Sequence, residues 1–423
     1  MLGIERAQEV LTARGQSFRI AMAMRSIFLL IAIAFLSLTP AYVSSKEAET
    51  GRPDSTIRVG AERLELYLPS LQGKRVGLVC NHASLLGDTL LLPDALTARG
   101  VNVVRLFTPE HGLTGTADAG EHVKHGYDAK RRIEVVSLYG QQRKPSAHQM
   151  RGIDVMVFDL QDVGVRCYTY VSTLQYVIDA CIEYHVSLIV LDRPNPNGHY
   201  VAGPILQPAY RSFVGMHTVP WVHGLTMGEF ARMIQGEWLP KGPQSLQLTV
   251  IPCSGYTHAT RYMPPVPPSP NLPNEQSILL YSTLALFEGT TMSVGRGTDW
   301  PFQVLGSPDV QRLPFTFTPQ ARPGATQPPY LGRLCRGIDL RMHSVDSLRA
   351  DTVIRLELLQ EMRRHSPKGQ AFFNTFFTRL AGTPALRKAL EADSSADSIR
   401  ASWQDELTAY RRMRAKYLLY PER

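Results

Sequence analysis

The sequence predicts an α/β fold in which a doubly wound, mostly parallel sheet is followed by a smaller C-terminal α+β domain. Two observations predict the sheet. The run 153–160 is β-branched and apolar, with polar residues only at Asp154 and Asp159 near its ends, which is typical of a central strand covered on both faces. Similar runs alternate with segments of helical length, and parallel strands require such right-handed crossovers. The first half of the chain is therefore expected to form one layered domain.

The elements of this first domain, placed at residues 56–205, follow in regular order. We expect strands at 75–80, 101–107, 133–138, 153–160 and 187–191, and helices at 91–99 and 173–184. The alternation stops in the 200s, where we place a C-terminal domain at 206–423. Its expected elements are a helix at 229–237, a rigid proline-rich strap at 263–273, a helix at 277–287, a glycine-rich loop at 293–302, a strand at 337–342, and helices at 346–365 and 385–418.

Residues 1–45 are predicted to be a secretory signal peptide with an upstream extension. The apolar run 27–38 follows Arg25 and is too short to span a bilayer. Met24 is the candidate start of the signal itself, and cleavage is expected within 41–45. No cysteine directly follows the run, which argues against a lipid anchor. We therefore expect a secreted or periplasmic protein that keeps no stable membrane anchor after cleavage.

Charge and cysteine content exclude several classes of protein. The chain of 423 residues carries a formal charge of +8, and since residues 1–45 contain four Arg and two Glu, the remainder carries +6. This mild excess is spread along the chain without a basic block interleaved with aromatics, so no nucleic-acid partner is expected. The five cysteines are odd in number and scattered, which excludes a disulfide framework, and no pair has metal-ligand spacing. No oligomeric state is predicted.

Polar residues gather where the apolar runs end. The four clusters are Asn81 with His82, Glu110 with His111, residues 159–162, and residues 192–195. A parallel sheet places the carboxyl ends of its strands at one edge, and ligands of open α/β sheets bind beyond that edge. The clusters together therefore predict a polar site there.

Carboxylates dominate the predicted site, because the usual nucleotide, zinc-protease and serine-hydrolase motifs are absent. Glu110 lies between Pro109 and His111, so its carboxyl group should be held rigidly where partial burial favours the protonated form of a general acid. A turn-capping role is the alternative for Glu110. Asp159 and Asp162 could stabilise a cationic transition state, form structural ion pairs or bind a metal. Metal binding is the least favoured of these interpretations, because the sequence shows no closely spaced group of His, Asp and Glu residues.

Two arginines and two tyrosines complete the candidate set. Arg166 and Arg296 lie in polar or glycine-rich loops, where a guanidinium can hold a carboxylate through two parallel hydrogen bonds, although a surface ion pair is the alternative. Tyr168 and Tyr170 would face opposite ways in an extended segment, so at most one of them is needed to line the site.

Five motifs carry a resemblance to a known family. They are VCNHAS at 79–84, FTPEHG at 107–112, FDLQDVGVRCYTY at 158–170, DRPNP at 192–196 and EGTTMSVGRGTDWPF at 288–302. Together they resemble the NamZ-type exo-β-N-acetylmuramidases, from about Val59 to the C-terminus. The resemblance implies a Rossmann-like domain, a smaller C-terminal domain and an active site in the cleft between them. It also implies removal of β-linked N-acetylmuramic acid from the non-reducing end of peptidoglycan fragments, without a cofactor and with Glu110 as the leading catalytic candidate.

This implied reaction agrees with the chemistry of the candidate residues. Glycoside hydrolysis needs a proton donor and usually a second carboxylate, which Glu110 with Asp159 or Asp162 could supply; the 2-acetamido group of the substrate is an alternative nucleophile. Arg166 or Arg296 could hold the lactyl carboxylate. The candidate substrate-binding residues are Asn81, His82, His111, Gln161, Arg166, Tyr168, Tyr170, Asn195, Glu288 and Arg296. A non-catalytic binding protein for muropeptides or acidic amino sugars, and a metal-dependent hydrolase, are the alternative functions.

Overall fold

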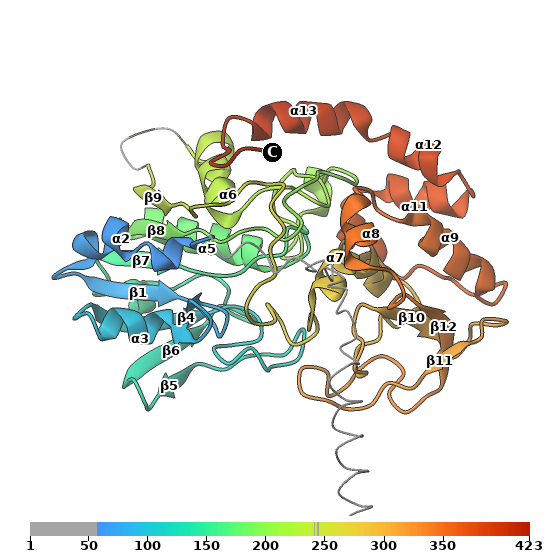
Figure 1. The fold of residues 1–423 in the computed structure, drawn as a ribbon, viewed down its shortest axis with the longest axis horizontal. Helices are drawn as coiled ribbons and strands as arrows, with labels where there is room; N and C mark the ends of the chain where they lie inside the picture. Colours follow the sequence, from blue (N-terminus) through green and yellow to red (C-terminus); the bar gives the residue numbers. More distant parts are fainter. Residues whose placement is uncertain (1–56, 241, 243–244) are drawn as a thin grey trace, which may run out of the picture. The chain divides into compact units, whose positions relative to one another are not determined.

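A seven-stranded sheet with the order β5-β6-β4-β1-β7-β8-β9 organises the first part of the chain in the computed structural model (Figure 1). Its strands are β1 (Arg75–Val79), β4 (Asn102–Thr108), β5 (Gly126–Asp128), β6 (Ile133–Ser137), β7 (Val155–Phe158), β8 (Ser187–Leu191) and β9 (Leu248–Ile251). All neighbouring pairs are parallel except β5 with β6. From β1 the chain adds β4 and β6 on one side and then β7, β8 and β9 on the other. The direction thus reverses between β1 and β7, which is the doubly wound, Rossmann-like topology that the sequence predicted.

The structure describes residues 57–240, 242 and 245–423. The signal peptide and extension predicted at residues 1–45 lie outside the described residues, so they stay a prediction, as does the secreted or periplasmic location that rests on them. Within the described residues, no helix has the length and apolar character needed to cross a bilayer.

Both faces of the sheet are buried, as expected for continuous apolar strands. Val76, Leu78 and Val157 belong to the cluster that includes residues of α2 (Leu64–Leu71) and α3 (Leu92–Thr97). The residues next to these in sequence point to the other face of the sheet, because side chains alternate along a strand. These adjacent residues join the cluster that includes residues of α5 (Tyr170–Glu183) and α6 (Met227–Met233). Figure 1 shows the helices on the two sides of the sheet.

Several short elements of the first part were not predicted. They are η1 (Gly60–Glu62), α2, the hairpin of β2 (Leu85–Leu86) and β3 (Leu90–Leu91), β5, α4 (Ala147–Met150), η2 (Pro208–Tyr210) and β9, while the predicted helix 229–237 ends in the π-helical turn η3 (Ile234–Trp238). The strand β9 adds to the first sheet from beyond residue 206, where the second domain was predicted to begin. The domain boundary itself stays a prediction.

A three-stranded antiparallel sheet and a set of helices form the later part of the chain (Figure 1). The strands are β10 (Val304–Ser307), β11 (Phe315–Phe317) and β12 (Cys335–Asp339), and the helices are α7 (Glu275–Leu284), η4 (Ala285–Gly289), α8 (Val345–Ala350), α9 (Leu356–His365), α10 (Phe376–Ala381), α11 (Pro384–Glu391), α12 (Ala396–Ala401) and α13 (Gln404–Arg414). Two predicted long helices are divided. The second breaks into α11, α12 and α13, where Ser395 accepts a hydrogen bond from the Ser398 N–H and so begins a new helix.

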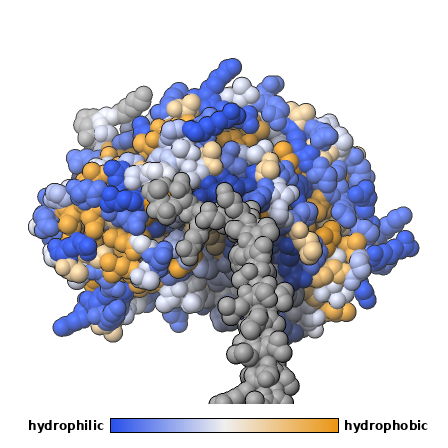
Figure 2. Space-filling model, in the orientation of Figure 1, coloured by the Kyte–Doolittle hydropathy of each residue, from blue (hydrophilic) through white to orange (hydrophobic). Residues whose placement is uncertain are grey.

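The two parts share one hydrophobic core, which includes residues of α5 and α6 from the first part and of α7, α9 and α10 from the second. The strap Met263–Pro273 packs on this body as predicted, since the Pro267 carbonyl accepts from His82 and the Pro268 carbonyl accepts from Tyr168. All five cysteines are buried and unpaired, which confirms the absence of a disulfide framework. On the face shown in Figure 2, hydrophilic residues are interspersed with apolar ones.

Candidate active site

A cavity of about 360 Å³ lies beyond the carboxyl ends of β4, β6 and β7. Its first wall comes from the loops that follow these strands and includes Glu110, Tyr139 and Thr169. The opposite wall comes from the later part of the chain and includes Glu288 and Arg296. The cavity therefore brings polar side chains from both parts of the chain to the edge where ligands of doubly wound sheets bind.

Glu110 is held at the mouth of the sheet by hydrogen-bond donors on both carboxylate oxygens. The Thr169 hydroxyl donates to Oε2 at 2.7 Å, and the Gly120 N–H donates to Oε1 at 3.0 Å. The Tyr139 side chain lines the cavity beside the same carboxylate, and burial together with the charge of Glu110 raises the pKa of Tyr139. The backbone after Glu110 turns sharply because His111 adopts a φ of 70°. These contacts fix the carboxyl group and direct it into the cavity.

Glu288 and Arg296 form an ion pair on the opposite wall. Arg296 Nε and Nη2 lie 2.9 and 2.8 Å from Glu288 Oε1, and the guanidinium stacks on the Phe302 ring with 4.9 Å between Cζ and the ring centroid. Both side chains are partly exposed. The predicted Gly-rich loop thus contributes a cation and a carboxylate that line the same cavity as Glu110.

Tyr168 and Tyr170 both line the cavity, although at most one of them was expected to be needed. The segment is a turn that leads into α5, which begins at Tyr170, so the two rings do not point in opposite directions as they would along a strand. They pack edge to face with 4.7 Å between centroids, and the hydroxyl of Tyr168 donates to the Pro268 carbonyl at 2.9 Å. The strap therefore closes the cavity over these rings.

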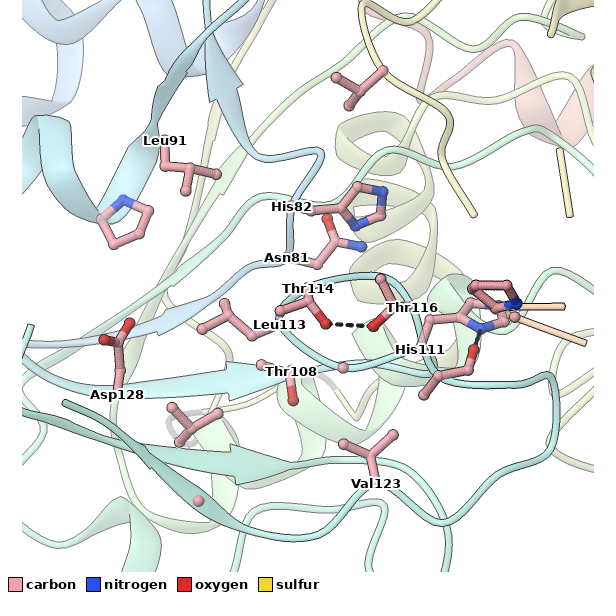
Figure 3. Close-up of a pocket in the computed structure, with 18 of the residues that line it drawn as sticks. Asn81, His82, Leu91, Thr108, His111, Leu113, Thr114, Thr116, Val123 and Asp128 are labelled. Atoms are coloured by element: carbon pink, nitrogen blue, oxygen red, sulfur yellow. Dashed lines mark hydrogen bonds between the residues drawn. The ribbon is translucent and has the colours of Figure 1, made fainter. Parts of the chain in front are cut away.

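A larger groove of about 1190 Å³ adjoins the cavity and shares His111 with it (Figure 3). Asn81 and His82, at the end of β1, line this groove, and Asn81 Nδ2 donates to the Tyr170 hydroxyl at 2.9 Å. Burial lowers the pKa of both His82 and His111, which favours neutral imidazoles. Three of the predicted residues thus lie in the groove, and only His111 among them also reaches the cavity.

Asp159 and Asp162 are engaged inside the protein instead of lining the cavity. Asp159 is fully buried and holds Arg193 through both oxygens, with Nε–Oδ1 2.6 Å and Nη2–Oδ2 2.9 Å. Asp162 accepts the Gly164 N–H at 2.7 Å and lies 3.5 Å from His223 Nε2. This placement does not bring either carboxylate to the cavity, and ion pairing, the alternative expected for both, is observed for Asp159.

Arg166 is also placed away from the cavity. Its guanidinium is buried and donates to four backbone carbonyls, at Pro204, Val219, Leu380 and Ala381, over distances of 2.7 to 3.0 Å. All four terminal N–H groups are thereby used, so the expected contact with a substrate carboxylate is not available to Arg166.

Gln161 and Asn195 brace the loops after β7 and β8. The Gln161 amide donates to the Pro194 carbonyl at 2.9 Å, and the Asn195 amide donates to the Leu225 carbonyl at 2.8 Å. Both side chains are buried, and neither lines the cavity. The structure therefore gives both a structural role, and their contact with substrate stays a prediction.

The sequence analysis missed Thr169 and the Gly120 N–H, which donate hydrogen bonds to Glu110, and Tyr139, which lines the cavity beside it. Tyr139 directly follows the predicted strand 133–138, in the same position relative to its strand as the polar clusters that were selected. Thr169 lies between the two tyrosines that were selected. Only Gly120, ten residues from Glu110 in an irregular loop, carried no signal.

Among the residues that the structure describes, no group of three or more His, Cys, Asp or Glu side chains is placed to hold an ion. The fold and the cavity define a doubly wound α/β protein with a carboxyl group fixed above the carboxyl ends of its strands. A carboxyl group held in this way, in a cavity sized for a small ligand, is typical of enzymes that use acid–base catalysis.

Two family models match successive segments of the chain. The model described as exo-β-N-acetylmuramidase NamZ, N-terminal, matches residues 76–276, and the C-terminal model of the same family matches residues 279–420. The chain belongs to the exo-β-N-acetylmuramidase NamZ family, and it is a homologue of glycosidases.

Individual relatives agree with this assignment. The chain is 33% identical over 412 residues to the peptidoglycan β-N-acetylmuramidase NamZ of Bacillus subtilis (strain 168), which covers 93% of this chain and 98% of the relative. Two crystal structures of DUF1343 family proteins from Bacteroides fragilis NCTC 9343 are also similar. They are 42% and 28% identical with TM-scores of 0.80 and 0.71, and each comparison covers 87% of this chain and 100% of the other.

Proposed function

We propose that this protein releases β-linked N-acetylmuramic acid from the non-reducing end of peptidoglycan fragments, with Glu110 as the general acid and base. The observation that carries the proposal is the placement of Glu110, whose carboxyl group accepts hydrogen bonds from Thr169 and Gly120 and lines a cavity of about 360 Å³ together with Tyr139. A volume at the lower end of the range for small-molecule sites suits one terminal sugar, as an exo-acting enzyme requires.

The proposed reaction begins with proton transfer from Glu110 to the glycosidic oxygen as the bond to the anomeric carbon breaks. The leaving sugar departs as an alcohol, and Glu110, now ionised, accepts a proton from the water that completes hydrolysis. Donors on both oxygens hold the carboxyl group in one orientation through the two steps. Glu110 therefore alternates between the two roles without a change of position.

Glu288 replaces Asp159 and Asp162 as our candidate for the second catalytic group, because it is the carboxylate that lines the cavity opposite Glu110. It is paired with Arg296, and a carboxylate in this place would stabilise the positive charge that develops on the sugar ring. The same negative charge could orient the 2-acetamido group if the substrate supplies the nucleophile. Arg296 remains the cation placed to attract the lactyl carboxylate.

The test compares the wild-type protein with Glu110→Gln on the β-linked disaccharide of N-acetylmuramic acid and N-acetylglucosamine. We expect the wild type to release both sugars and the variant to lose roughly 10²- to 10⁴-fold in kcat, the usual contribution of a general acid. Binding of the disaccharide to Glu110→Gln, measured by calorimetry, should persist because Gln keeps the shape of the side chain. Binding by the wild type without release of sugar would indicate a carrier of acidic amino sugars instead of an enzyme.

A further inference from the structure

The loop that carries Glu110 runs from β4 to β5 without helix or strand and folds back on itself. Its tip is a turn in which the Asp118 N–H donates to Glu121 Oε2 at 2.8 Å and the Glu121 N–H donates to the Asp118 carbonyl at 3.1 Å. Gly120 lies inside this turn with a φ of 82°. The turn thereby directs the Gly120 N–H at Glu110 Oε1.

The turn is tied to the later part of the chain through one carboxylate oxygen. Asp118 Oδ2 accepts both the backbone N–H of Thr326, at 2.5 Å, and the Thr326 hydroxyl, at 2.6 Å. The segment around Thr326 is itself anchored, because Ala325 and Arg322 exchange backbone hydrogen bonds and Asn271 of the strap donates to the Gly324 carbonyl. A fixed point on the C-terminal part therefore holds Asp118.

Few other contacts hold the tip in place. Among the hydrogen bonds that the structure gives for residues 118–121, only the one from Gly120 to Glu110 and the two from Thr326 to Asp118 leave the turn. Ala119, Gly120 and Glu121 are exposed, so packing adds little. The orientation of the Gly120 N–H thus depends on Thr326.

We propose that Asp118 and Thr326 are positioning residues, which couple contact between the two parts of the chain to the orientation of the catalytic carboxyl group. The inference rests on the proposed role of Glu110. When Thr326 holds Asp118, the turn presents the Gly120 N–H to Glu110; when the contact opens, Glu110 loses one of its fixed donors. The carboxyl group is fully oriented only while the two walls of the cavity are joined.

The test uses Thr326→Val, which removes the hydroxyl and keeps the shape of the side chain, and Thr326→Ser, which keeps the hydroxyl. A matched control is Thr257→Val, because the Thr257 hydroxyl bonds only within its own loop, to Thr260 at 2.9 Å. For release of N-acetylmuramic acid we expect kcat to fall about fivefold in Thr326→Val, the usual effect of one hydrogen bond, with KM nearly constant. Thr326→Ser and Thr257→Val should retain the wild-type kcat.

A second measurement does not depend on activity. Hydrogen exchange of the Gly120 amide, followed by NMR in the full-length mature protein, should be several-fold faster in Thr326→Val than in the wild type and in Thr257→Val. Unchanged exchange would overturn the coupling, and so would a rise in KM at constant kcat, since that would make Thr326 a substrate contact. Failure of the proposed function is seen separately, as activity that survives Glu110→Gln.

Discussion

Polar residues follow the strands on both sides of the point between β1 and β7 where the strand order reverses, but their environments differ on the two sides. After β4 and β6, Glu110 and Tyr139 line an open cavity. After β7 and β8, Asp159 and Asp192 are completely buried. All four residues directly follow, or nearly follow, an apolar strand, so position along the chain does not separate the two groups.

The two groups differ in the hydrogen-bond and ion-pair partners that the protein interior provides for them. Asp159 has a buried arginine, Arg193, held through both oxygens. Asp192 accepts the hydroxyls of Thr226 and Tyr420 and the N–H of Gly228 at the start of α6. A carboxylate whose oxygens are all used inside the protein stabilises the fold, whereas one that also faces a cavity is free to exchange a proton with a ligand.

The largest effect is expected for Asp159→Asn, which leaves the Arg193 guanidinium buried beside a neutral amide. Breaking a buried ion pair on one side costs about 3–5 kcal/mol, so the free energy of unfolding in urea should fall by that amount. Glu110→Gln should change it by less than about 1 kcal/mol, because the Gln oxygen can still accept from the Gly120 N–H and the Thr169 hydroxyl can accept from the Gln amide. Equal losses of stability in the two variants would contradict the division between the structural carboxylate Asp159 and the proposed catalytic carboxylate Glu110.

A pH-dependent effect is expected at Asp192, since burial raises its pKa to about 6. Below pH 4 the group is protonated in both states, and between pH 4 and 6 the unfolded chain ionises while the folded protein does not. The free energy of unfolding should therefore fall by about 3 kcal/mol as the pH rises from 4 to 6, and then level off. Asp192→Asn keeps an acceptor for Gly228 and removes the titration, so the difference between the two unfolding curves should show this slope; parallel curves would contradict it.

The smallest effect is expected for Tyr139→Phe. The ring contact with Phe213, at 5.7 Å between centroids, is kept, while the hydroxyl that senses the charge of Glu110 is lost. One polar contact of this kind is worth about 1 kcal/mol, so kcat should fall about fivefold with little change in melting temperature. A large drop in melting temperature with normal turnover would instead assign Tyr139 to the structural group.

Much of the fold could be predicted because the strands are continuous apolar runs. The strand at 187–191 has the predicted bounds, whereas the helix expected at 385–418 is divided by caps such as Ser395, which a periodic pattern does not reveal. In the site, Glu110 was identified from its Pro and His neighbours. The sequence did not show that Asp159 differs from Glu110 in being an internal ion-pair partner, because Arg193 lies 34 residues away and the pairing depends on the folded chain. Thr326, 208 residues from Asp118, is further beyond the reach of spacing arguments.

The buried guanidinium of Arg166 ties together the two segments that the family models match. Two of its four carbonyl partners, Leu380 and Ala381, end α10, so the segment matched by the first family model supplies a cation that the segment matched by the second must complete. Trp221 and Ser282 repeat the pattern, with the indole N–H of one segment bonded to a carbonyl of the other. Separated, each half would carry unpaired polar groups. The two segments are therefore expected to be gained and lost together, and not exchanged as independent modules.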